Sequence, residues 1–172
     1  MNRIVIIGTS CSGKTTLAKE LSKQLNIKHI ELDELHWKPN WEEREKDEFI
    51  RLLDEEISSS SSWVVDGNYA EVRELLWSKA TTIIWLNYAF PLVLGRAILR
   101  TIKRVATQQE VCAGNKESFR QAFLSQESII WWVIKTHRSN NKRYNSLLYG
   151  EKYKDIKVVE LTSQNMTDRF LK

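Results

Sequence analysis

The chain has 172 residues, of which 42% are hydrophobic and 28% charged, and its formal net charge is +4. This composition is typical of a globular protein and excludes a disordered, collagen-like or membrane-spanning chain. A chain of this length buries about 70% of the surface that its unfolded form exposes, so it needs no disulfide to fold. We expect one domain over residues 1–172, in the cytosol, because we find neither a bilayer-spanning apolar run nor a secretory signal.

Strand-like and helix-like segments alternate along the first part of the chain. A β-branched run predicts a strand at 3–7, and apolar residues at helical spacing predict a helix at 14–25. A short strand at 28–32 precedes an amphipathic helix at 41–57, which ends at the five serines of 58–62. This order of elements is typical of an α/β fold.

The alternation continues to the end of the chain. The predicted elements are a strand at 63–66, a short helix at 71–79, a strand at 81–87, a helix from 91 to about 105, a long helix at 117–135, a strand at 156–161 and a closing helix at 166–171. Segment 107–116 and the basic segment after residue 135 are predicted to be loops. The strand at 81–87 is apolar without alternation, which indicates burial on both faces and parallel pairing. We therefore predict a three-layer α/β fold with a mobile helical lid, about residues 91–142, between the fourth and fifth strands.

The clearest motif lies between the first predicted strand and the first predicted helix. Residues 8–15 read G-x-x-x-x-G-K-T, the pattern of a phosphate-binding loop. Its glycines let the backbone wrap a phosphate, and its N–H groups bind the anion at the start of the helix. Lys14 is predicted to reach the β- and γ-phosphates of ATP, and Thr15 to offer its hydroxyl group to Mg²⁺. The predicted nucleotide-binding residues are Gly8, Ser10, Cys11, Ser12, Gly13, Lys14, Thr15 and Thr16.

Two acidic residues stand where other predicted strands end. Asp33 follows the strand at 28–32, and Asp66 ends the strand at 63–66. Ligands bind outside the carboxyl ends of the strands in an open parallel sheet, so both carboxylates are expected to face the phosphate loop. Asp66 is predicted to hold Mg²⁺ together with Thr15. Asp33 is predicted to orient or deprotonate an acceptor hydroxyl group, or to hold a metal-bound water. A turn-forming role is the alternative for each aspartate.

Basic residues form two further groups. Arg96, Arg100 and Arg104 recur at every fourth position of one predicted helix, and no acidic residue lies in this stripe. Arginines of a lid can close over a transferring γ-phosphate, and a solvated helix face is the alternative. The second group is suited to an acceptor phosphate, with Arg138 as the catalytic candidate, or to a nucleic-acid backbone. It consists of Lys135, His137, Arg138, Lys142 and Arg143.

Other side chains add weaker signals. Cys11 and Cys112 are too few for a disulfide framework or a zinc site, so we expect two reduced thiols and no metal besides magnesium. Trp37, shortly after Asp33, is a candidate wall of a base or acceptor site, with core packing as the alternative.

Together these segments resemble a known family. Residues 8–16, 32–37 (LDELHW) and 63–69 (WVVDGNY) and the helix after Pro91 are similar to those of the bacterial phosphate-loop proteins labelled DNA topology modulation proteins, which in turn are similar to adenylate kinases. The resemblance covers nearly the whole chain. It implies a five-stranded parallel sheet in the order 2-3-1-4-5, ATP and Mg²⁺ as ligands, and a lid between strands four and five. Adenylate kinases carry Asp-Gly-Phe-Pro-Arg where residues 66–70 read Asp-Gly-Asn-Tyr-Ala, so AMP is not implied as the acceptor.

These features predict a small-molecule phosphotransferase, a nucleotide or nucleoside kinase-like enzyme with an unidentified acceptor. A hydrolytic ATPase would carry a second acid directly after Asp66, where this chain has Gly67. A GTP switch would carry Asn-Lys-x-Asp, whereas residues 141–144 read Asn-Lys-Arg-Tyr. The main alternative is a nucleotide-gated, nucleic-acid-binding regulator of DNA topology that uses the basic group at 135–143. A nucleotide-binding protein without enzymatic activity is the third hypothesis.

Overall fold

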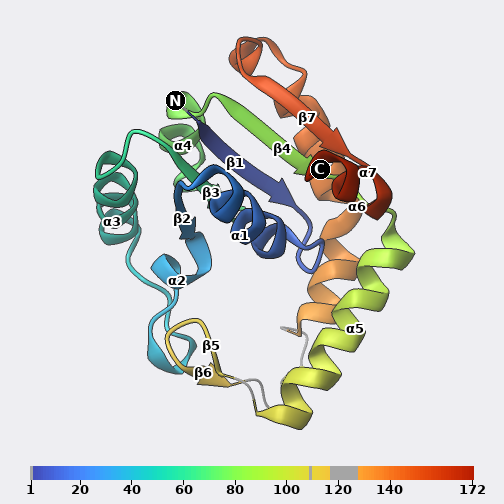
Figure 1. The fold of residues 1–172 in the computed structure, drawn as a ribbon. Coiled ribbons are helices and arrows are strands. Elements are labelled where there is room, and N and C mark those ends of the chain that lie inside the picture. Colours follow the sequence, from blue (N-terminus) through green and yellow to red (C-terminus); the bar gives the residue numbers. More distant parts are fainter. Residues whose placement is uncertain (1, 109, 117–127) are drawn as a thin grey trace.

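A five-stranded, all-parallel sheet forms the centre of the computed structural model, which describes residues 2–108, 110–116 and 128–172 (Figure 1). The strands lie in the order β2-β3-β1-β4-β7. This arrangement confirms the predicted α/β fold class and the strand order 2-3-1-4-5. The strands are β1 (Arg3–Gly8), β2 (Lys28–Glu31), β3 (Trp63–Asp66), β4 (Thr82–Leu86) and β7 (Lys157–Leu161).

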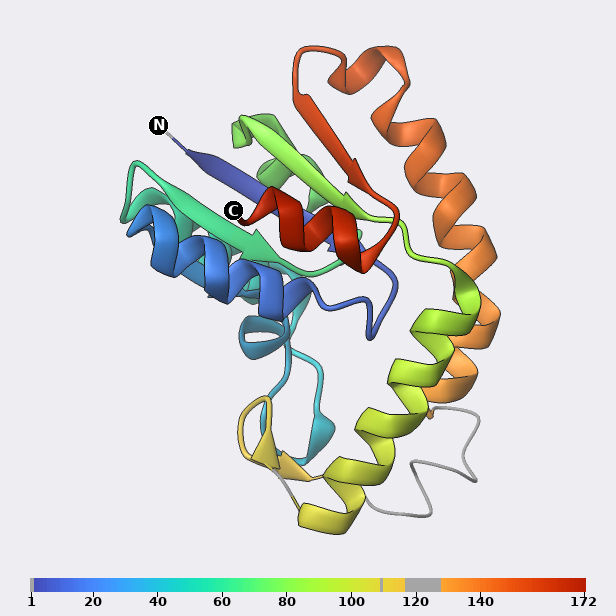
Figure 2. The same ribbon diagram turned by 45° about the vertical axis from the view of Figure 1, so that its right-hand side comes forward.

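Helices cover both faces of the sheet. Figures 1 and 2 show α1 and α7 on one face and α3, α4 and α6 on the other. Alternate residues of β1 point to the two faces, with Val5 and Ile7 in one hydrophobic cluster and Ile4 and Ile6 in the other. The bounds of the helices are α1 (Lys14–Leu25), α3 (Lys46–Ser58), α4 (Arg73–Lys79), α5 (Phe90–Thr107), α6 (Ile129–Leu148) and α7 (Gln164–Phe170), with a short 3-10 helix η3 (Glu151–Tyr153).

The pairing of the strands places their carboxyl ends at one edge of the sheet. Ile6 is paired with Asp66 on β3, and Gly8 is paired with Leu86 on β4. The predicted burial of the fourth strand on both faces is confirmed, because each residue of β4 after Thr82 is buried. The loop after β1 and the aspartate at the end of β3 therefore lie side by side.

The segment after β2 differs from the prediction. The strand ends at Glu31, and Leu32 and Asp33 begin a short helix, α2 (Leu32–His36). The predicted helix at 41–57 begins only at Lys46, because a 3-10 helix, η1 (Pro39–Trp41), and a turn come first. The N–H group of Arg44 donates to the carbonyl of His36, which folds the chain back before α3 starts.

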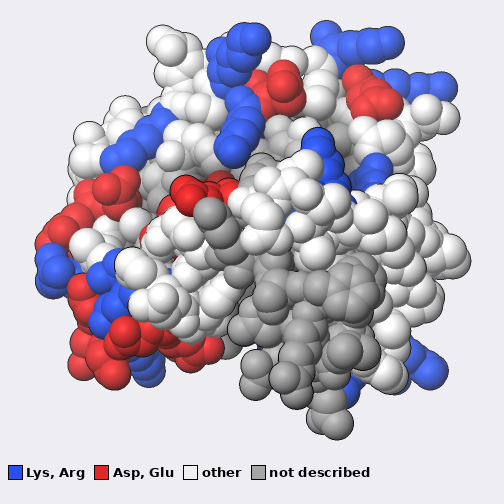
Figure 3. All heavy atoms as spheres, turned by 90° about the horizontal axis from the view of Figure 1, so that it is seen from below, with Lys and Arg blue, Asp and Glu red and all other residues white. Residues whose placement is uncertain are grey.

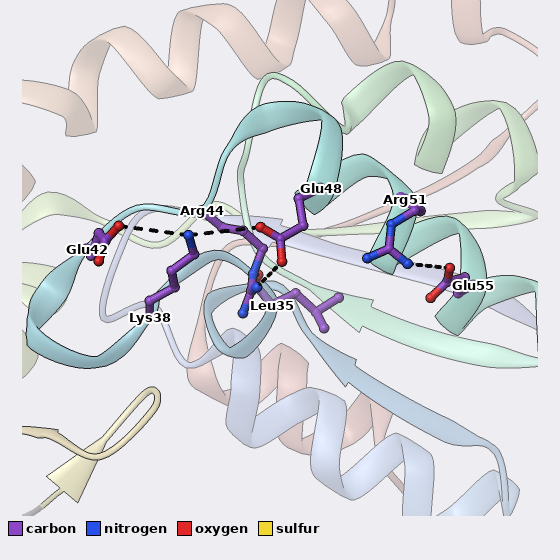
Figure 4. Close-up of polar contacts among 7 residues, drawn as sticks. All are labelled: Leu35, Lys38, Glu42, Arg44, Glu48, Arg51 and Glu55. Carbon is purple, nitrogen blue, oxygen red and sulfur yellow. Dashed lines mark hydrogen bonds and ion pairs between the residues drawn. The ribbon is translucent and has the colours of Figure 1, made fainter.

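Side-chain contacts fix this turn to the helices on either side (Figure 4). The Arg44 side chain donates to the carbonyl of Leu35 at 2.8 Å and forms an ion pair with Glu48 at 2.5 Å. Lys38 lies within 4.0 Å of carboxylate oxygens of Glu42 and Glu48. The segment that carries Asp33 is therefore held against α3.

The region between β4 and β7 corrects two predictions. The polar stretch 107–116 contains a small antiparallel hairpin, β5 (Glu110–Val111) and β6 (Asn115–Lys116), instead of a plain loop. The long helix α6 begins at Ile129, and the part of the predicted helix at 117–127 lies outside the described residues. The helix continues to Leu148, through a segment predicted to be a loop, because Val133, Tyr144 and Leu148 form a buried stripe at helical spacing.

None of the helices in the described ranges combines the length and the apolar composition that crossing a bilayer requires.

Candidate functional site

The loop between β1 and α1 has the backbone geometry of an anion-binding turn. Gly8 has a φ of 152°, and a Cβ atom there would lie 2.7 Å from the carbonyl oxygen of Leu86. Gly13 has a left-handed conformation directly before α1, where a side chain would strain the backbone. The hydroxyl group of Ser12 is buried and has no hydrogen-bond partner among the described residues. The loop thus offers backbone donors and one unsatisfied hydroxyl group at the start of a helix.

Lys14 is the charged centre of this loop. Its ammonium group donates to the carbonyl of Thr9 at 3.3 Å. Burial lowers its pKa, while the negative charges of Asp33 and Asp66 act in the opposite direction and the positive charge of Arg100 lowers the pKa further. Charges act on a group in this way only over short distances. The structure therefore brings together residues from four separate segments that were selected in the sequence.

Asp66 is buried at the end of β3 and is bonded on both oxygens. The hydroxyl group of Thr15 donates to its Oδ2 atom at 2.6 Å, and Nε2 of His29 lies 2.6 Å from its Oδ1 atom. The Thr15 hydroxyl group is also 3.4 Å from Oε1 of Glu31. Two carboxylates and a hydroxyl group thus present oxygen atoms at the start of α1, and oxygen is the ligand type that Mg²⁺ prefers.

His29 and Glu31 were not selected from the sequence. Burial raises the pKa of Glu31, and the charges of Asp66 and Asp33 raise it further, so three carboxylates lie close together. Residues 29 and 31 flank the buried Ile30 on β2, and alternation places both on the face opposite to Ile30. This alternation was the one signal in the sequence that could have found them.

Asp33 lies in the first turn of α2 and is half-buried. The phenol group of Tyr69, in the segment between β3 and α4, donates to its Oδ1 atom at 2.7 Å. The Tyr69 ring packs on the buried ring of His36, with 4.3 Å between the ring centroids. Trp37, the candidate wall residue, packs edge-on against His36 at 4.9 Å. An aromatic cluster therefore supports the Asp33 carboxylate.

The residues between Asp66 and Tyr69 connect this cluster to the phosphate loop. The side-chain amide of Asn68 bonds to both backbone polar groups of Gly8, accepting from its N–H group at 3.3 Å and donating to its carbonyl. A Cβ atom on Gly67 would lie 2.6 Å from Cβ of Leu32. Only a glycine fits there, and Asn68 then braces the start of the phosphate loop.

The four selected arginines have different environments. Arg96 donates to the carbonyl of Ser12 at 2.9 Å and to Oε1 of Gln164 at 2.6 Å, so it contacts the phosphate loop directly. Arg100 is half-buried, and its Nε atom has no hydrogen-bond partner within the described part of the chain. Arg104 acts electrostatically on the thiol of Cys112. Arg138 is exposed on α6, and within the described ranges no hydrogen bond or ion pair links it to the phosphate loop.

The β5–β6 hairpin contacts the segment that follows Asp33. The side-chain amide of Asn115, which is buried, accepts from the N–H group of Trp41 and donates to the carbonyl of Lys38, each at 2.9 Å. The pKa of Cys112 is raised to about 12, mainly by burial and secondly by the negative charge of Asp33. The hairpin, which the sequence did not predict, thus brings Cys112 close to Asp33.

Four of the five residues of the second basic group are exposed on α6, namely Lys135, Arg138, Lys142 and Arg143. The fifth, His137, is half-buried, and its Nε2 atom donates to the carbonyl of Tyr88 at 3.0 Å. Figure 3 views the molecule from the end at which α5 and the hairpin project. It shows the largest group of acidic side chains on the left, the side on which Figure 1 places α3.

Comparisons with known proteins agree with this geometry. The model of the AAA_18 family, described as an AAA domain, matches residues 4–172. The uncharacterized protein YqaC of Bacillus subtilis (strain 168) is 26% identical over 127 residues, which cover 73% of this chain and 71% of YqaC.

Several solved kinase structures share the fold. A shikimate kinase from Acinetobacter baumannii, solved in complex with shikimate, has a TM-score of 0.64 at 15% identity and is covered over 89% of its chain. A shikimate kinase from Bacteroides thetaiotaomicron has a TM-score of 0.58 at 15% identity, with 94% covered. A sugar kinase from Janibacter sp. HTCC2649 has a TM-score of 0.52 at 14% identity, with 92% covered. Each match covers 99% of this chain, and at such low identity the likeness shows the fold alone.

Proposed function

Because this chain belongs to the AAA_18 family and has the fold of phosphate-loop kinases, we propose that it is an ATP-dependent phosphotransferase acting on the hydroxyl group of a small acceptor. One observation carries the proposal: Asp33, Asp66 and Arg100 all act electrostatically on Lys14 in the phosphate loop. A kinase needs these charges together, because it neutralises a phosphoryl group while it orients a hydroxyl group.

The phosphate loop fits the phosphates of ATP. The Ser12 hydroxyl group is buried and has no hydrogen-bond partner among the described residues. Lys14 and Arg100 are two cations that repel each other. A polyanion between them would satisfy the hydroxyl group and offset the repulsion. Arg96 would support the loop from outside, through its bond to the Ser12 carbonyl. Gly8, Ser10, Cys11, Gly13 and Thr16 would contribute backbone and side-chain groups of the same loop.

The residues beside the loop fit Mg²⁺. Within the described ranges, no group of three or more potential ligands is arranged to hold a metal ion by itself. Mg²⁺ typically takes one or two protein oxygens together with substrate phosphates and water, and Thr15 and Asp66 supply such oxygens. When bound, the ion would supply positive charge to the phosphates.

The acceptor would bind on the side of Asp33. This carboxylate is close enough to the phosphate loop to act on Lys14, and the Tyr69 bond occupies only its Oδ1 atom. Oδ2 would accept the hydrogen bond of the acceptor hydroxyl group and direct its oxygen toward the γ-phosphoryl group. Arg104 and Arg138 would contribute positive charge from the lid. We propose as this lid the segment of about residues 91–142 within one domain formed by residues 1–172.

The experiment is an acceptor screen with the purified protein, ATP and Mg²⁺. ADP release is measured against nucleosides, nucleotides, sugars and shikimate, and phosphorus NMR identifies the product. At least one compound should stimulate ADP release in the wild-type protein and not in Lys14→Ala. ATP binding without stimulation by any compound would favour a nucleotide-binding protein without enzymatic activity. No ATP binding at all would refute the proposal.

The nucleic-acid alternative, to which the resemblance to DNA topology modulation proteins also points, depends on α6. Lys135, Arg138 and Lys142 are exposed and recur at helical spacing, next to the exposed Trp131. Basic side chains beside an aromatic ring are suited to nucleic acid. Three such cations neutralise few phosphates, so we rank this function second.

A further inference from the structure

The hydrogen bond between Tyr69 and Asp33 joins two segments that both reach the candidate acceptor side. Tyr69 follows β3, and Asp33 follows β2, the neighbouring strand of the sheet. The phenol group donates to Oδ1 of Asp33 at 2.7 Å. Among the described residues, it is the one side-chain hydrogen bond to this carboxylate. Asp33 thus has one fixed oxygen and one remaining oxygen.

The Tyr69 ring cannot turn away from Asp33 without disturbing its neighbours. It packs at 4.3 Å on the buried His36 ring and edge-on at 5.3 Å on the buried Phe49 ring. The Trp37 ring packs edge-on against the same His36 ring at 4.9 Å. Two neighbours thus hold the Tyr69 ring, and a third ring supports one of them.

From this geometry we infer that Tyr69 is a positioning residue that orients the Asp33 carboxylate for the acceptor hydroxyl group. The inference rests on the proposed function. The terminal torsion of an aspartate is broad, so a carboxylate without a partner samples many orientations. A bond from a fixed phenol group selects one of them and directs Oδ2 away from Tyr69. Orientation of this kind matters because misplacement of a reacting group by about 1 Å can cost a hundredfold in rate.

The protonation state of the phenol group supports the inference. Burial raises the pKa of Tyr69, and the charge of Asp33 raises it further. The phenol group therefore keeps its proton throughout the neutral range and remains a hydrogen-bond donor to Asp33 there.

The first test compares crystal structures of the full-length wild-type protein, Tyr69→Phe and Tyr149→Phe, each with a non-hydrolysable ATP analogue and Mg²⁺. Tyr149→Phe is a matched control, because it removes another hydrogen bond from a phenol group to a carboxylate, the 3.0 Å bond to Glu160. The Asp33 carboxylate should rotate or occupy two orientations in Tyr69→Phe and stay in place in the control. An unchanged, single orientation in Tyr69→Phe would overturn the inference, whether or not an acceptor is known.

The second test measures kinetics with whichever compound of the acceptor screen gives the highest activity. Tyr69→Phe should lower kcat/KM for that acceptor about tenfold, the effect of one hydrogen bond to a charged group, and leave the KM for ATP unchanged. In an Asp33→Asn background the same substitution should have no further effect. An equal loss in both backgrounds would show a merely structural role and overturn the inference.

A second variant covers the case in which Tyr69→Phe folds poorly. Trp37→Phe keeps the Tyr69 phenol group and shortens only the ring that packs on His36, so it should lower kcat/KM by much less than about tenfold and leave the Asp33 carboxylate in place. A loss of about tenfold, or a rotated Asp33 carboxylate, in Trp37→Phe would contradict the role assigned to the phenol group. If the wild-type protein phosphorylates no compound, the proposed function fails, and the crystal structures still decide the role of Tyr69.

Discussion

The hydroxyl group of Thr15 donates to Oδ2 of Asp66 at 2.6 Å, which connects the first turn of α1 to the end of β3. These residues meet because β1 and β3 are parallel neighbours whose carboxyl ends lie at one edge of the sheet. His29 on β2 holds the other carboxylate oxygen of Asp66 at 2.6 Å. The pair is therefore fixed from three elements before any ligand binds.

Asp66→Asn should separate metal binding from nucleotide binding. The amide keeps the size of the side chain and loses the charge that Mg²⁺ requires. Titration of the activity with Mg²⁺ should show a requirement raised at least about tenfold, while binding of the nucleotide in EDTA changes by less than about twofold. Asp54→Asn is the control, because its carboxylate pairs with Lys79 at a surface away from the phosphate loop. Equal losses with and without Mg²⁺ would contradict the metal role.

Lys14→Ala should abolish ATP binding and keep the fold. The expected loss of affinity is on the order of a hundredfold or more, because the variant lacks the cation of the loop. Burial lowers the pKa of Lys14, so its charged form is disfavoured in the folded protein, and the melting temperature should stay the same or rise. Isothermal titration calorimetry gives the affinity, and Lys23→Ala, exposed on the same helix, is the control. Unchanged ATP binding in a folded Lys14→Ala protein would refute the site.

The fold and the phosphate loop could be predicted because they depend on local sequence patterns. The helix predicted at 14–25 matches α1 residue for residue, and the strand at 63–66 matches β3. Asp33 and Asp66 were found through a general property of parallel sheets, the convergence of strand ends. Each of these signals lies within a few residues of the chain.

Other features of the fold and of the candidate site could not be predicted, because they depend on contacts between distant segments. Asn115 contacts Trp41 across 74 positions, and nothing near Asn115 in the sequence signals this pairing. The second half of α6 is rich in polar residues, and only the packing of Tyr144 and Leu148 on the sheet makes it helical. Tyr69 likewise has no visible role until the fold places it beside Asp33.

Tyr69 should make the stability of the protein fall at alkaline pH. The pKa of an unfolded tyrosine is about 10, and burial followed by the charge of Asp33 raises it in the folded protein. Above about pH 10 the unfolded chain binds fewer protons than the folded one, so the free energy of unfolding decreases. Between about pH 9 and 11, ionisation of Tyr69 in the unfolded chain lowers the free energy of unfolding by about 1.4 kcal/mol.

Urea unfolding of the wild-type protein and Tyr69→Phe at the two pH values measures the contribution of Tyr69 to this loss of stability. The variant should lose less stability than the wild-type protein. Tyr144, whose pKa burial raises to about 12, contributes to both proteins and cancels in the comparison. The same pH dependence in both proteins would show that Tyr69 ionises normally.

Any binding of DNA should be weak and sensitive to salt. The exposed cations of α6 that share a face are Lys135, Arg138 and Lys142. Neutralising about three phosphates predicts a loss of affinity of about 40-fold between 50 and 200 mM salt, without sequence preference. Fluorescence anisotropy with a labelled duplex measures it, and Arg138→Ala should reduce the salt dependence. Nanomolar, sequence-selective binding at physiological salt would place the nucleic-acid function first.

Arg100→Ala should weaken the closure of the proposed lid over the nucleotide. Arg100 is half-buried, its Nε atom has no hydrogen-bond partner in the described ranges, and its charge lowers the pKa of Lys14. Anionic phosphates between the two cations would stabilise the closed state relative to the open one, which is the condition for ligand-driven closure.

A non-hydrolysable ATP analogue with Mg²⁺ should therefore slow amide hydrogen exchange in residues 100–108 and 110–116 of the wild-type protein. This slowing should be reduced in Arg100→Ala and retained in Lys103→Ala, an exposed residue of the same helix. Exchange that does not respond to nucleotide, or responds equally in both variants, would make Arg100 part of an ordinary solvated helix face.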